Sequence, residues 1–168
     1  MNEMDLGIST SRLRLRGLSE ADAAFIFELV NSPGWLRYIG DRQVVDLERA
    51  SAYISKILGS SHVLYIAVET IENGVPIGII TLIKREYLEH RDIGFAFLPE
   101  FEGCGYAVEA AQAVLNQVVK MESDSRVLAT TLPENIRSIK LLERLGLQFE
   151  KSIHVGGEEL SVFGVDLK

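Results

Sequence analysis

The sequence has a single cysteine, three histidines and no long uninterrupted apolar run. Cys104 has no second cysteine with which to pair, which excludes an intramolecular disulfide. His62, His90 and His154 are separated by spacings that match no zinc-binding motif. We therefore predict that the protein holds no metal ion.

Basic clusters and targeting segments are also scarce. The formal net charge is −7 and, apart from alternating arginines near the start, no basic run exceeds Lys84-Arg85, which disfavours nucleic-acid binding. The first ten residues lack the positive region and the apolar run of a signal peptide. The apolar runs fall far short of the roughly 20 residues that cross a membrane. We expect a cytoplasmic protein that binds neither nucleic acid nor membrane, with an acidic surface that suits a cationic substrate.

Length and apolar content favour one domain over residues 1–168. The chain is 47% hydrophobic, and a chain of this size buries roughly two-thirds of its unfolded surface. Residue patterns predict strands and helices that interleave, which favours an α/β or α+β fold with a mixed sheet rather than a doubly wound parallel fold. The expected strands are 12–16, 63–68, 77–83, 92–98, 126–131, 147–153 and 160–166. The expected helices run from Ser19 to a Pro33-Gly34 stop, from Asp46 to Gly59, and over about 107–120 and 136–144.

Three arginines share one face of the first predicted strand. Arg12, Arg14 and Arg16 alternate with two leucines, which is the pattern of a half-buried strand. We interpret the arginine face as solvated.

Residues 92–111 pass from an apolar strand through a glycine-bearing turn into a helix. Pro99 ends the strand, Gly103 and Gly105 allow a tight bend, and a helical run starts at Ala107. Free N–H groups and the positive dipole end at such a helix start can hold a phosphate without lysine or metal. The segment predicts a phosphorylated cofactor; a purely structural strand-to-helix connection is the alternative.

The glycine spacing excludes two common nucleotide loops. Neither glycine is followed by the Lys-Ser or Lys-Thr of a triphosphate-binding loop, and Val108 takes the third glycine position of a dinucleotide fingerprint. Residues 102–107, EGCGYA, instead resemble the acyl-coenzyme A loop of the GNAT N-acetyltransferases, Gln/Arg-x-x-Gly-x-Gly/Ala. Glu102 departs from that pattern because it replaces the usual Gln or Arg.

Two further segments resemble the same family, in its ribosomal-protein alanine N-acetyltransferase-like branch. The opening TSRLRLR at residues 10–16, followed by LSEADA at 18–23, is similar to the branch pattern T-x-R-L-x-L-R with a later D-A. NIRSIKLLERLGL at residues 135–147 is similar to N-x-x-S-x-x-x-L-E-K-x-G-F. Together the three segments cover nearly the whole chain in the expected order.

The resemblance implies a GNAT-type central sheet, mixed and mostly antiparallel, with seven strands and about four flanking helices. The sheet is splayed between the Asp92 strand and the Arg126 strand, where the pantetheine arm of acetyl-coenzyme A enters and pairs with the strand edge. The implied cofactor contacts are Phe97, Leu98, Gly103, Cys104, Gly105, Tyr106, Ala107 and Asn135. Helix N-capping is the alternative role of Asn135. Cys104 acts there through its backbone and not as a nucleophile, because no histidine base is close in sequence.

The implied activity is an acetyl-coenzyme A-dependent N-acetyltransferase in which a primary amine attacks the thioester directly. A backbone N–H of residues 95–98 stabilises the oxyanion. Ser138 is the implied proton donor to the departing thiolate, and Asp92 the base that acts through water. The alternatives are a helix-start serine and an exposed strand-start carboxylate. Glu69 and Glu86 are further candidates for the base.

Residues 31–42 occupy the region that forms one wall of the acceptor site in this family. Trp35 and Tyr38 are the expected aromatic contacts, and Asp41 offers a carboxylate to an ammonium group. A packed loop whose Trp35 and Ile39 cover the core is the alternative. The acceptor is a peptide or protein N-terminal amine or a small-molecule amine. A non-catalytic acyl-coenzyme A sensor is the alternative function, and both a monomer and a homodimer stay open.

Overall fold

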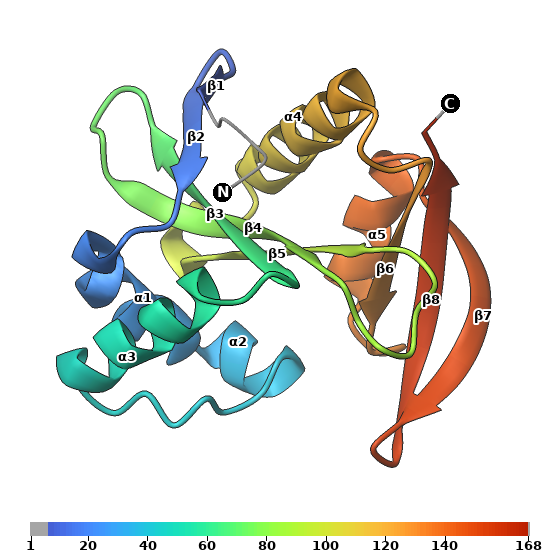
Figure 1. Ribbon diagram of the computed structural model, residues 1–168, viewed down its shortest axis with the longest axis horizontal. Helices are drawn as coiled ribbons and strands as arrows, with labels where there is room; N and C mark the ends of the chain where they lie inside the picture. The colour runs from blue at the N-terminus through green and yellow to red at the C-terminus, as the bar shows by residue number, and fades with distance from the viewer. Residues whose placement is uncertain (1–6, 168) are drawn as a thin grey trace.

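The computed structural model describes residues 7–167 and centres on one eight-stranded sheet (Figure 1). The strands are β1 (Ile8–Ser9), β2 (Leu13–Gly17), β3 (Val63–Thr70), β4 (Pro76–Ile83), β5 (Asp92–Phe97), β6 (Arg126–Thr131), β7 (Gln148–Val155) and β8 (Glu158–Asp166). Their order across the sheet is β1-β2-β3-β4-β5-β6-β8-β7. Neighbours are antiparallel except for the parallel pair β5 and β6. The signal-peptide expectation concerns mainly residues 1–6, which lie outside the described residues.

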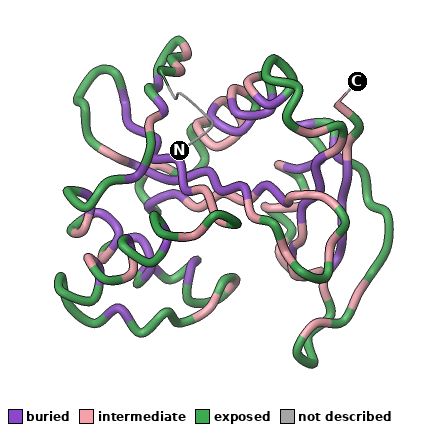
Figure 2. The backbone as a smooth tube through the Cα atoms, viewed as in Figure 1, coloured by how far each residue is buried: buried purple, intermediate pink, exposed green. Residues whose placement is uncertain are grey.

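Helices cover both faces of this sheet. They are α1 (Ala23–Val30), α2 (Pro33–Tyr38), α3 (Leu47–Leu58), α4 (Tyr106–Met121) and α5 (Ile136–Arg144). Residues on β3 alternate between two cores: Ile66 and Val68 join the core under α4, whereas Tyr65 and Ala67 join the core under α1 and α3. Figure 2 shows burial concentrated in the central strands, while β7 at the sheet edge is largely exposed.

The predicted fold class is confirmed, and the structure adds the short elements β1 and α2 to the expected ones. The prediction that Pro33 and Gly34 end the first helix is wrong, since α1 ends at Val30 and Pro33 begins α2. Proline suits that position because its fixed φ matches the first helical turn, where its missing N–H would have no partner. Gly146, with φ 94°, follows the end of α5 as expected.

The sheet opens between β5 and β6. Among residues 7–167, only Asp92 and Leu128 are paired across these two strands. Next to this pair, the Leu128 N–H donates a hydrogen bond of 3.0 Å to the Arg91 carbonyl. Past this point β5 stays with β4, and β6 turns away with β8 (Figure 1). One edge of β5 therefore faces an opening, as the resemblance implied.

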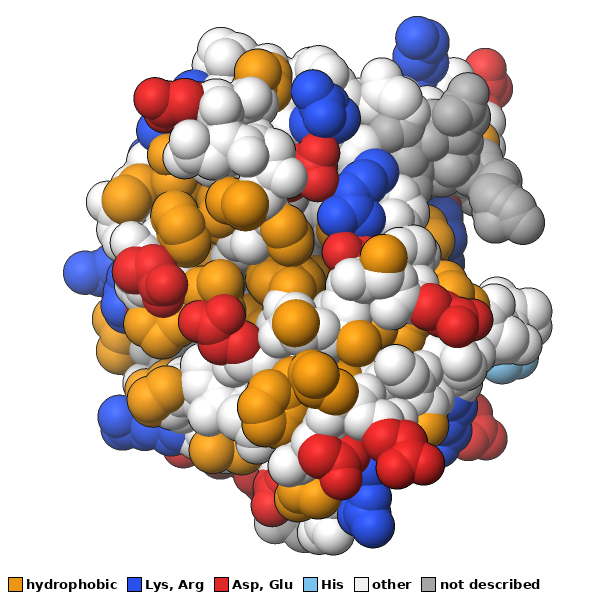
Figure 3. All heavy atoms as spheres, turned by 90° about the vertical axis from the view of Figure 1, so that its left-hand side faces the viewer, with side chains coloured by type: hydrophobic (Ala, Val, Ile, Leu, Met, Phe, Trp, Pro, Cys, Tyr) orange, Lys and Arg blue, Asp and Glu red, His pale blue; other side chains and the backbone are white. Residues whose placement is uncertain are grey.

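The surface mixes charged and apolar side chains. On the face shown in Figure 3, hydrophobic side chains lie among acidic ones. Large apolar residues exposed between α2 and the end of α3 are Leu36, Ile39, Val45, Leu47 and Leu58. In the part of the chain that the structure describes, no helix is long and apolar enough to cross a membrane.

Candidate functional site

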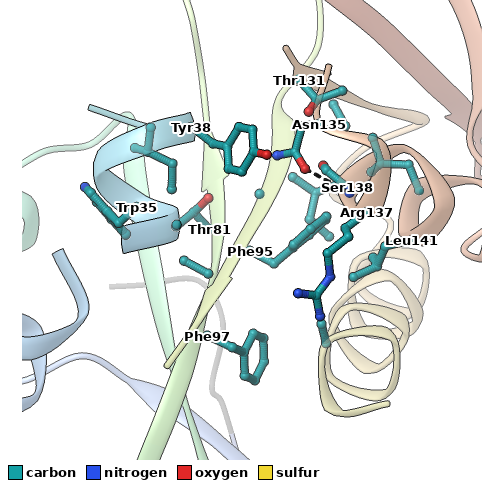
Figure 4. A pocket seen from close by; sticks show the side chains of 18 of the residues that line it. Trp35, Tyr38, Thr81, Phe95, Phe97, Thr131, Asn135, Arg137, Ser138 and Leu141 are labelled. Carbon is teal, nitrogen blue, oxygen red and sulfur yellow. Dashed lines mark hydrogen bonds between the residues drawn. The ribbon is translucent and has the colours of Figure 1, made fainter. Parts of the chain in front are cut away.

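A cavity of about 920 Å³ occupies the opening between β5 and β6. Its walls come from α2, the inner strands β4 and β5, the turn before α4, the end of β6 and one side of α5 (Figure 4). The hairpin of β7 and β8 adds Glu158 and Leu160. The site therefore combines segments from both sides of the split sheet.

The backbone of β5 presents alternate residues to the cavity. Leu98 donates its N–H to the Ile77 carbonyl on the β4 side (2.9 Å), whereas the Arg91 carbonyl accepts from β6 on the other side. Because successive residues of a strand point their N–H and C=O groups to opposite sides, Phe95 and Phe97 direct theirs toward the opening. These groups lack a strand partner there and are available to a ligand that lies along β5.

The predicted contacts Phe97 and Leu98 thus differ in placement. Phe97 lines the cavity, and its ring lies across Gly78 of β4, where an added Cβ would overlap the ring. Leu98 is buried in the core under α1 and α3 and is not part of the cavity wall. Of this predicted pair, only Phe97 is placed to meet a ligand in the opening.

The turn before α4 presents free backbone donors beside the cavity. Gly103 and Gly105 have φ values of 78° and 82°, a left-handed conformation that favours glycine. Gly105 is the N-cap of α4, so no side chain caps the free N–H groups of the first helical turn. Tyr106 and Ala107 lie in that turn and, like both glycines, line the cavity. The Cys104 side chain is exposed and lies outside the wall.

Arg12 and Glu109 form an ion pair, here called the Arg12–Glu109 clamp, that holds this turn in place. The sequence alone did not indicate a role for either residue at the site. Arg12 donates from Nη1 to the Cys104 carbonyl (3.1 Å) and from Nε to Glu109 (2.8 Å), and its guanidinium lies 4.3 Å from the Tyr106 ring centroid. Burial acts to raise the pKa of Glu109, but hydrogen bonds from Thr10 and Arg12 hold the pKa below its usual value. Since the peptide is planar and trans, fixing the Cys104 carbonyl turns the Gly105 N–H away from Arg12.

Three cationic side chains of α5 also line the cavity. Glu102, the departure from the family loop pattern, accepts a hydrogen bond from Arg137 (3.2 Å). Arg137 lies beside the turn in the cavity wall, and Lys140 and Arg144 line the wall further along α5. Arg137 therefore offsets the negative charge that Glu102 brings to the loop, and the pair adds no net positive charge there.

Asn135 and Ser138 line the cavity together at the start of α5. Asn135 is the N-cap, and its Oδ1 accepts from the Ser138 N–H (3.2 Å), so the capping alternative is confirmed. Capping uses only the oxygen of the amide, and the two Nδ2 hydrogens remain donors for a ligand. A binding role is thus compatible with the cap.

Asp92 is buried, with 3% of its surface exposed, and so is not the exposed carboxylate of the alternative interpretation. Its Oδ2 accepts hydrogen bonds from Arg85 Nε (3.0 Å) and Thr130 Oγ1 (3.4 Å). Burial raises the pKa of Asp92 above its usual value, although Arg85 and Thr130 each lower it. Of the three carboxylates considered as a base, Asp92 lines the cavity, whereas Glu69 and Glu86 do not.

The acceptor residues expected from 31–42 fall into three environments. Trp35 is 4% exposed and packs in the core under α1 and α3, as the packed-loop alternative states, while one side still lines the cavity. Tyr38 is half-buried and points from α2 toward Asn135 and Ser138 (Figure 4). Asp41 is exposed outside the cavity wall and accepts from the Gln43 N–H (2.8 Å).

A split mixed sheet whose opening ends at an uncapped helix start is the architecture of an acyl-coenzyme A-dependent transferase. The family model described as an acetyltransferase (GNAT) domain matches residues 12–148. The uncharacterized N-acetyltransferase YnaD of Bacillus subtilis (strain 168) is 31% identical over 156 residues, 90% of each chain. The chain therefore belongs to the GNAT acetyltransferase family and is an acetyl-coenzyme A-dependent acetyltransferase.

Solved structures are similar over almost the whole length of the chain. A GNAT-family acetyltransferase from Bacillus anthracis superposes with a TM-score of 0.80 at 27% identity, covering 95% of this chain and 98% of the other. RimL, a ribosomal L7/L12 alpha-N-protein acetyltransferase in complex with coenzyme A, also gives 0.80, at 14% identity and with 94% and 95% covered. The RimL likeness shows a shared fold.

Proposed function

We propose that the protein transfers the acetyl group of acetyl-coenzyme A to a primary amine by direct attack, within one domain that spans residues 1–168. The observation that carries this proposal is the row of unpartnered backbone groups on β5, at Phe95 and Phe97, which leads to the uncapped start of α4. Pantetheine amides lie along that edge as an added strand, and the pyrophosphate binds the turn at Gly103 and Gly105. RimL, with its bound coenzyme A, shares this fold.

The β5 edge also supplies the oxyanion donor. A pantetheine arm that runs along β5 places its thioester beside the part of the strand before the phosphate turn, where the Phe95 N–H faces the opening. A preorganised backbone N–H stabilises the negative oxygen of the tetrahedral intermediate. No covalent enzyme intermediate is needed, because binding both reactants in one cavity supplies much of the rate acceleration.

Proton transfers fall to the two side chains predicted for them. The neutral amine forms the new N–C bond, and its surplus proton passes through water to Asp92. The C–S bond breaks to release thiolate, and Ser138 passes its hydroxyl proton to the thiolate as it regains one from solvent water. Burial raises the pKa of Asp92, which makes it a stronger base once ionised. The acceptor is a protein N-terminal amine, as in the branch that residues 10–23 and 135–147 resemble, or a small-molecule amine.

Calorimetric titration with coenzyme A and a thiol-release assay with acetyl-coenzyme A test this function. Ser138→Ala keeps the N-cap, which uses the backbone N–H, so we expect the coenzyme A Kd to stay within about twofold while kcat falls by about 100-fold. Ser152→Ala, on the exposed strand β7, is the matched control and should keep full kcat.

Three results would count against the proposal. Unchanged kcat in Ser138→Ala would remove the proton-donor role. Tight coenzyme A binding without turnover of any amine would favour the sensor alternative. Absence of coenzyme A binding would refute the cofactor site itself.

A further inference from the structure

The cavity has two ends that differ in their charged groups. One end adjoins the phosphate turn at Gly103 and Gly105, beside Arg137. The other, here called the acceptor end, lies around Arg42, Tyr65, Thr81, Arg85 and Asp92. Strand β5 runs between the two ends, and at about 3.3 Å per residue Asp92 and Phe97 are roughly 16 Å apart. Charges at the acceptor end are therefore too distant to serve the phosphates of the cofactor.

The buried carboxylate at the acceptor end is already neutralised. Asp92 is paired with Arg85, and the two charges cancel within the cavity wall. Glu158 contributes one further carboxylate from the exposed tip of the hairpin of β7 and β8. The net charge of −7 is thus carried mainly by the outer surface and does not make this end of the cavity acidic.

Arg42 brings a positive charge to the acceptor end without a carboxylate partner. It lines the cavity, and among residues 7–167 no Asp or Glu lies within ion-pair distance of it. Gly40 has φ 126°, and a Cβ there would lie 3.2 Å from Nη1 of Arg42, so the side chain folds closely over this glycine. Burial raises the pKa of Tyr65, while the positive charges of Arg42 and Arg85, which line the same cavity, act to lower it.

Arg37 of α2 is a second arginine of the cavity wall. Its guanidinium lies 4.9 Å from the Tyr38 ring centroid, and within the described residues it also has no carboxylate partner. Both arginines line the cavity on the α2 side. A polycationic acceptor would meet two uncompensated positive charges there, whereas an anion would form charge-assisted hydrogen bonds.

We propose that the acceptor amine carries a carboxylate, which Arg42 binds while the amine points toward Asp92. This inference rests on the proposed function and names the substrate class of the same site. Two sources have this chemistry: the α-carboxylate of a free amino acid and an acidic side chain next to the N-terminus of a peptide. Net charge alone favoured a cationic substrate, whereas the charges of the cavity wall favour an amine that also carries a carboxylate.

The test compares amines that differ only in the carboxylate. Glycine, alanine and phenylalanine are assayed against their carboxamides, and peptide amides that begin alanine-aspartate against those that begin alanine-asparagine, at equal concentrations of unprotonated amine. We expect kcat/KM to be at least about tenfold higher for the carboxylate member of one series, since a hydrogen bond to a charged group has that effect. The series that shows the preference identifies the source.

Variants of Arg42 test whether this residue causes the preference for a carboxylate. Arg42→Gln should reduce the carboxylate preference to about one while leaving the coenzyme A Kd unchanged, and Arg42→Lys should restore part of the preference. Arg49→Gln is the matched control, because Arg49 is an exposed arginine of α3 outside the cavity wall. A preference that survives Arg42→Gln, or an equal or better rate with the carboxamides, overturns the inference while leaving acetyl transfer in place.

A binding measurement decides the case in which no amine of the panel is acetylated. N-acetylated amino acids and their carboxamides are titrated into the protein loaded with coenzyme A. Tighter binding of the carboxylates that is lost in Arg42→Gln supports the inference, and equal binding overturns it. If coenzyme A does not bind at all, the proposed function fails first, and this inference fails with it.

Discussion

Asp92, the proposed base, also affects the stability of the fold. Asp92 and Leu128 form the only pair that joins β5 to β6 in the described chain. The buried Asp92 carboxylate forms an ion pair with Arg85. Because the pKa of Asp92 is raised in the folded state, folding favours the protonated carboxyl, and that contribution is lost as the pH rises through the folded-state pKa. The Arg85 charge limits this loss by stabilising the ionised form.

Arg85→Gln should therefore destabilise the protein in a pH-dependent way. Without Arg85 the pKa of Asp92 rises further, so the ionised form present at pH 8 becomes more costly. We expect the free energy of unfolding to fall by about 2 kcal/mol. This loss is smaller than that for a fully buried ion pair, because the Arg85 side chain is 36% exposed and water screens its charge. At pH 5.5, where more of Asp92 is protonated, the loss should shrink.

Urea denaturation at the two pH values measures this difference. Lys84→Gln, at the exposed neighbouring residue, serves as control and should change the stability little at either pH. An equal loss for Arg85→Gln at pH 8 and pH 5.5 would mean that Arg85 acts through packing rather than through its charge on Asp92.

At the scale of elements, the segment between β1 and β2 is tied to the turn before α4. The Arg12–Glu109 clamp joins residues 97 positions apart in the sequence and fixes the Cys104 peptide at the start of α4. Helix N-terminal donors bind phosphate well only when they converge on it, so the orientation of this peptide bears on affinity. The TSRLRLR segment thus contacts the turn that is proposed to bind the cofactor.

Removing this clamp should weaken cofactor binding more than folding. We expect Arg12→Ala to raise the Kd for coenzyme A by about tenfold, the loss of roughly 1.4 kcal/mol. The free energy of unfolding should fall by less than about 1 kcal/mol, because the Arg12 side chain is 45% exposed. Isothermal titration and urea denaturation measure the two effects. Arg14→Ala is the control, because Arg14 lies two residues further on, in β2, and pairs with Glu69; it should leave the Kd unchanged. Equal Kd values for both variants would exclude an orienting role.

Local periodicity predicted the elements that are long and regular. The helices α4 and α5 and the strands from β3 to β8 follow from alternation or helical spacing within one segment. The six-residue α2 was missed because proline and glycine at its start resemble a helix stop. The arginines of β2 were read as solvated, yet Arg14 and Arg16 pair with Glu69, which a neighbouring strand brings opposite them.

The candidate site was predictable where a motif lies within one segment. Gly103, Gly105, Asn135 and Ser138 were found in this way, and all four line the cavity. Which side of β5 faces the opening depends on its pairing with β4, so the sequence did not distinguish Leu98 from its neighbours. Contacts between distant segments, such as the Arg12–Glu109 clamp, give no signal within a single short segment.

At the scale of the whole molecule, the split sheet joins two sets of strands. Strands β1 to β5 form one set, and β6, β8 and β7 form the other, with one registered pair between them in residues 7–167. The core under α4 continues across the split, since Val127 and Phe163 belong to the same cluster as Ile93. Packing thus holds the halves together below the cavity, while the backbone edge of β5 stays unpaired above it.

A ligand that fills this gap as an added strand should protect the edge of β5. We expect bound coenzyme A to slow amide hydrogen exchange at Phe95 and Phe97, whose N–H groups face the opening, and at the turn formed by Gly103 and Gly105. Adenosine 3′,5′-bisphosphate, which has the nucleotide but no pantetheine arm, should leave the β5 amides unprotected.

A thermal shift alone does not separate these two contributions. At a ligand concentration 100 times its Kd, stabilisation is about 2.7 kcal/mol whichever ligand binds, so the comparison is made at matched saturation. Under those conditions both ligands raise Tm by similar amounts, and only the exchange pattern reports where each one sits. Protection of Leu98 and Ala96 in place of Phe95 and Phe97 would contradict the strand-addition geometry, because those two residues direct their N–H groups toward β4. Equal protection of β5 by the bisphosphate would show that the edge closes through a change in the protein rather than through pairing with pantetheine.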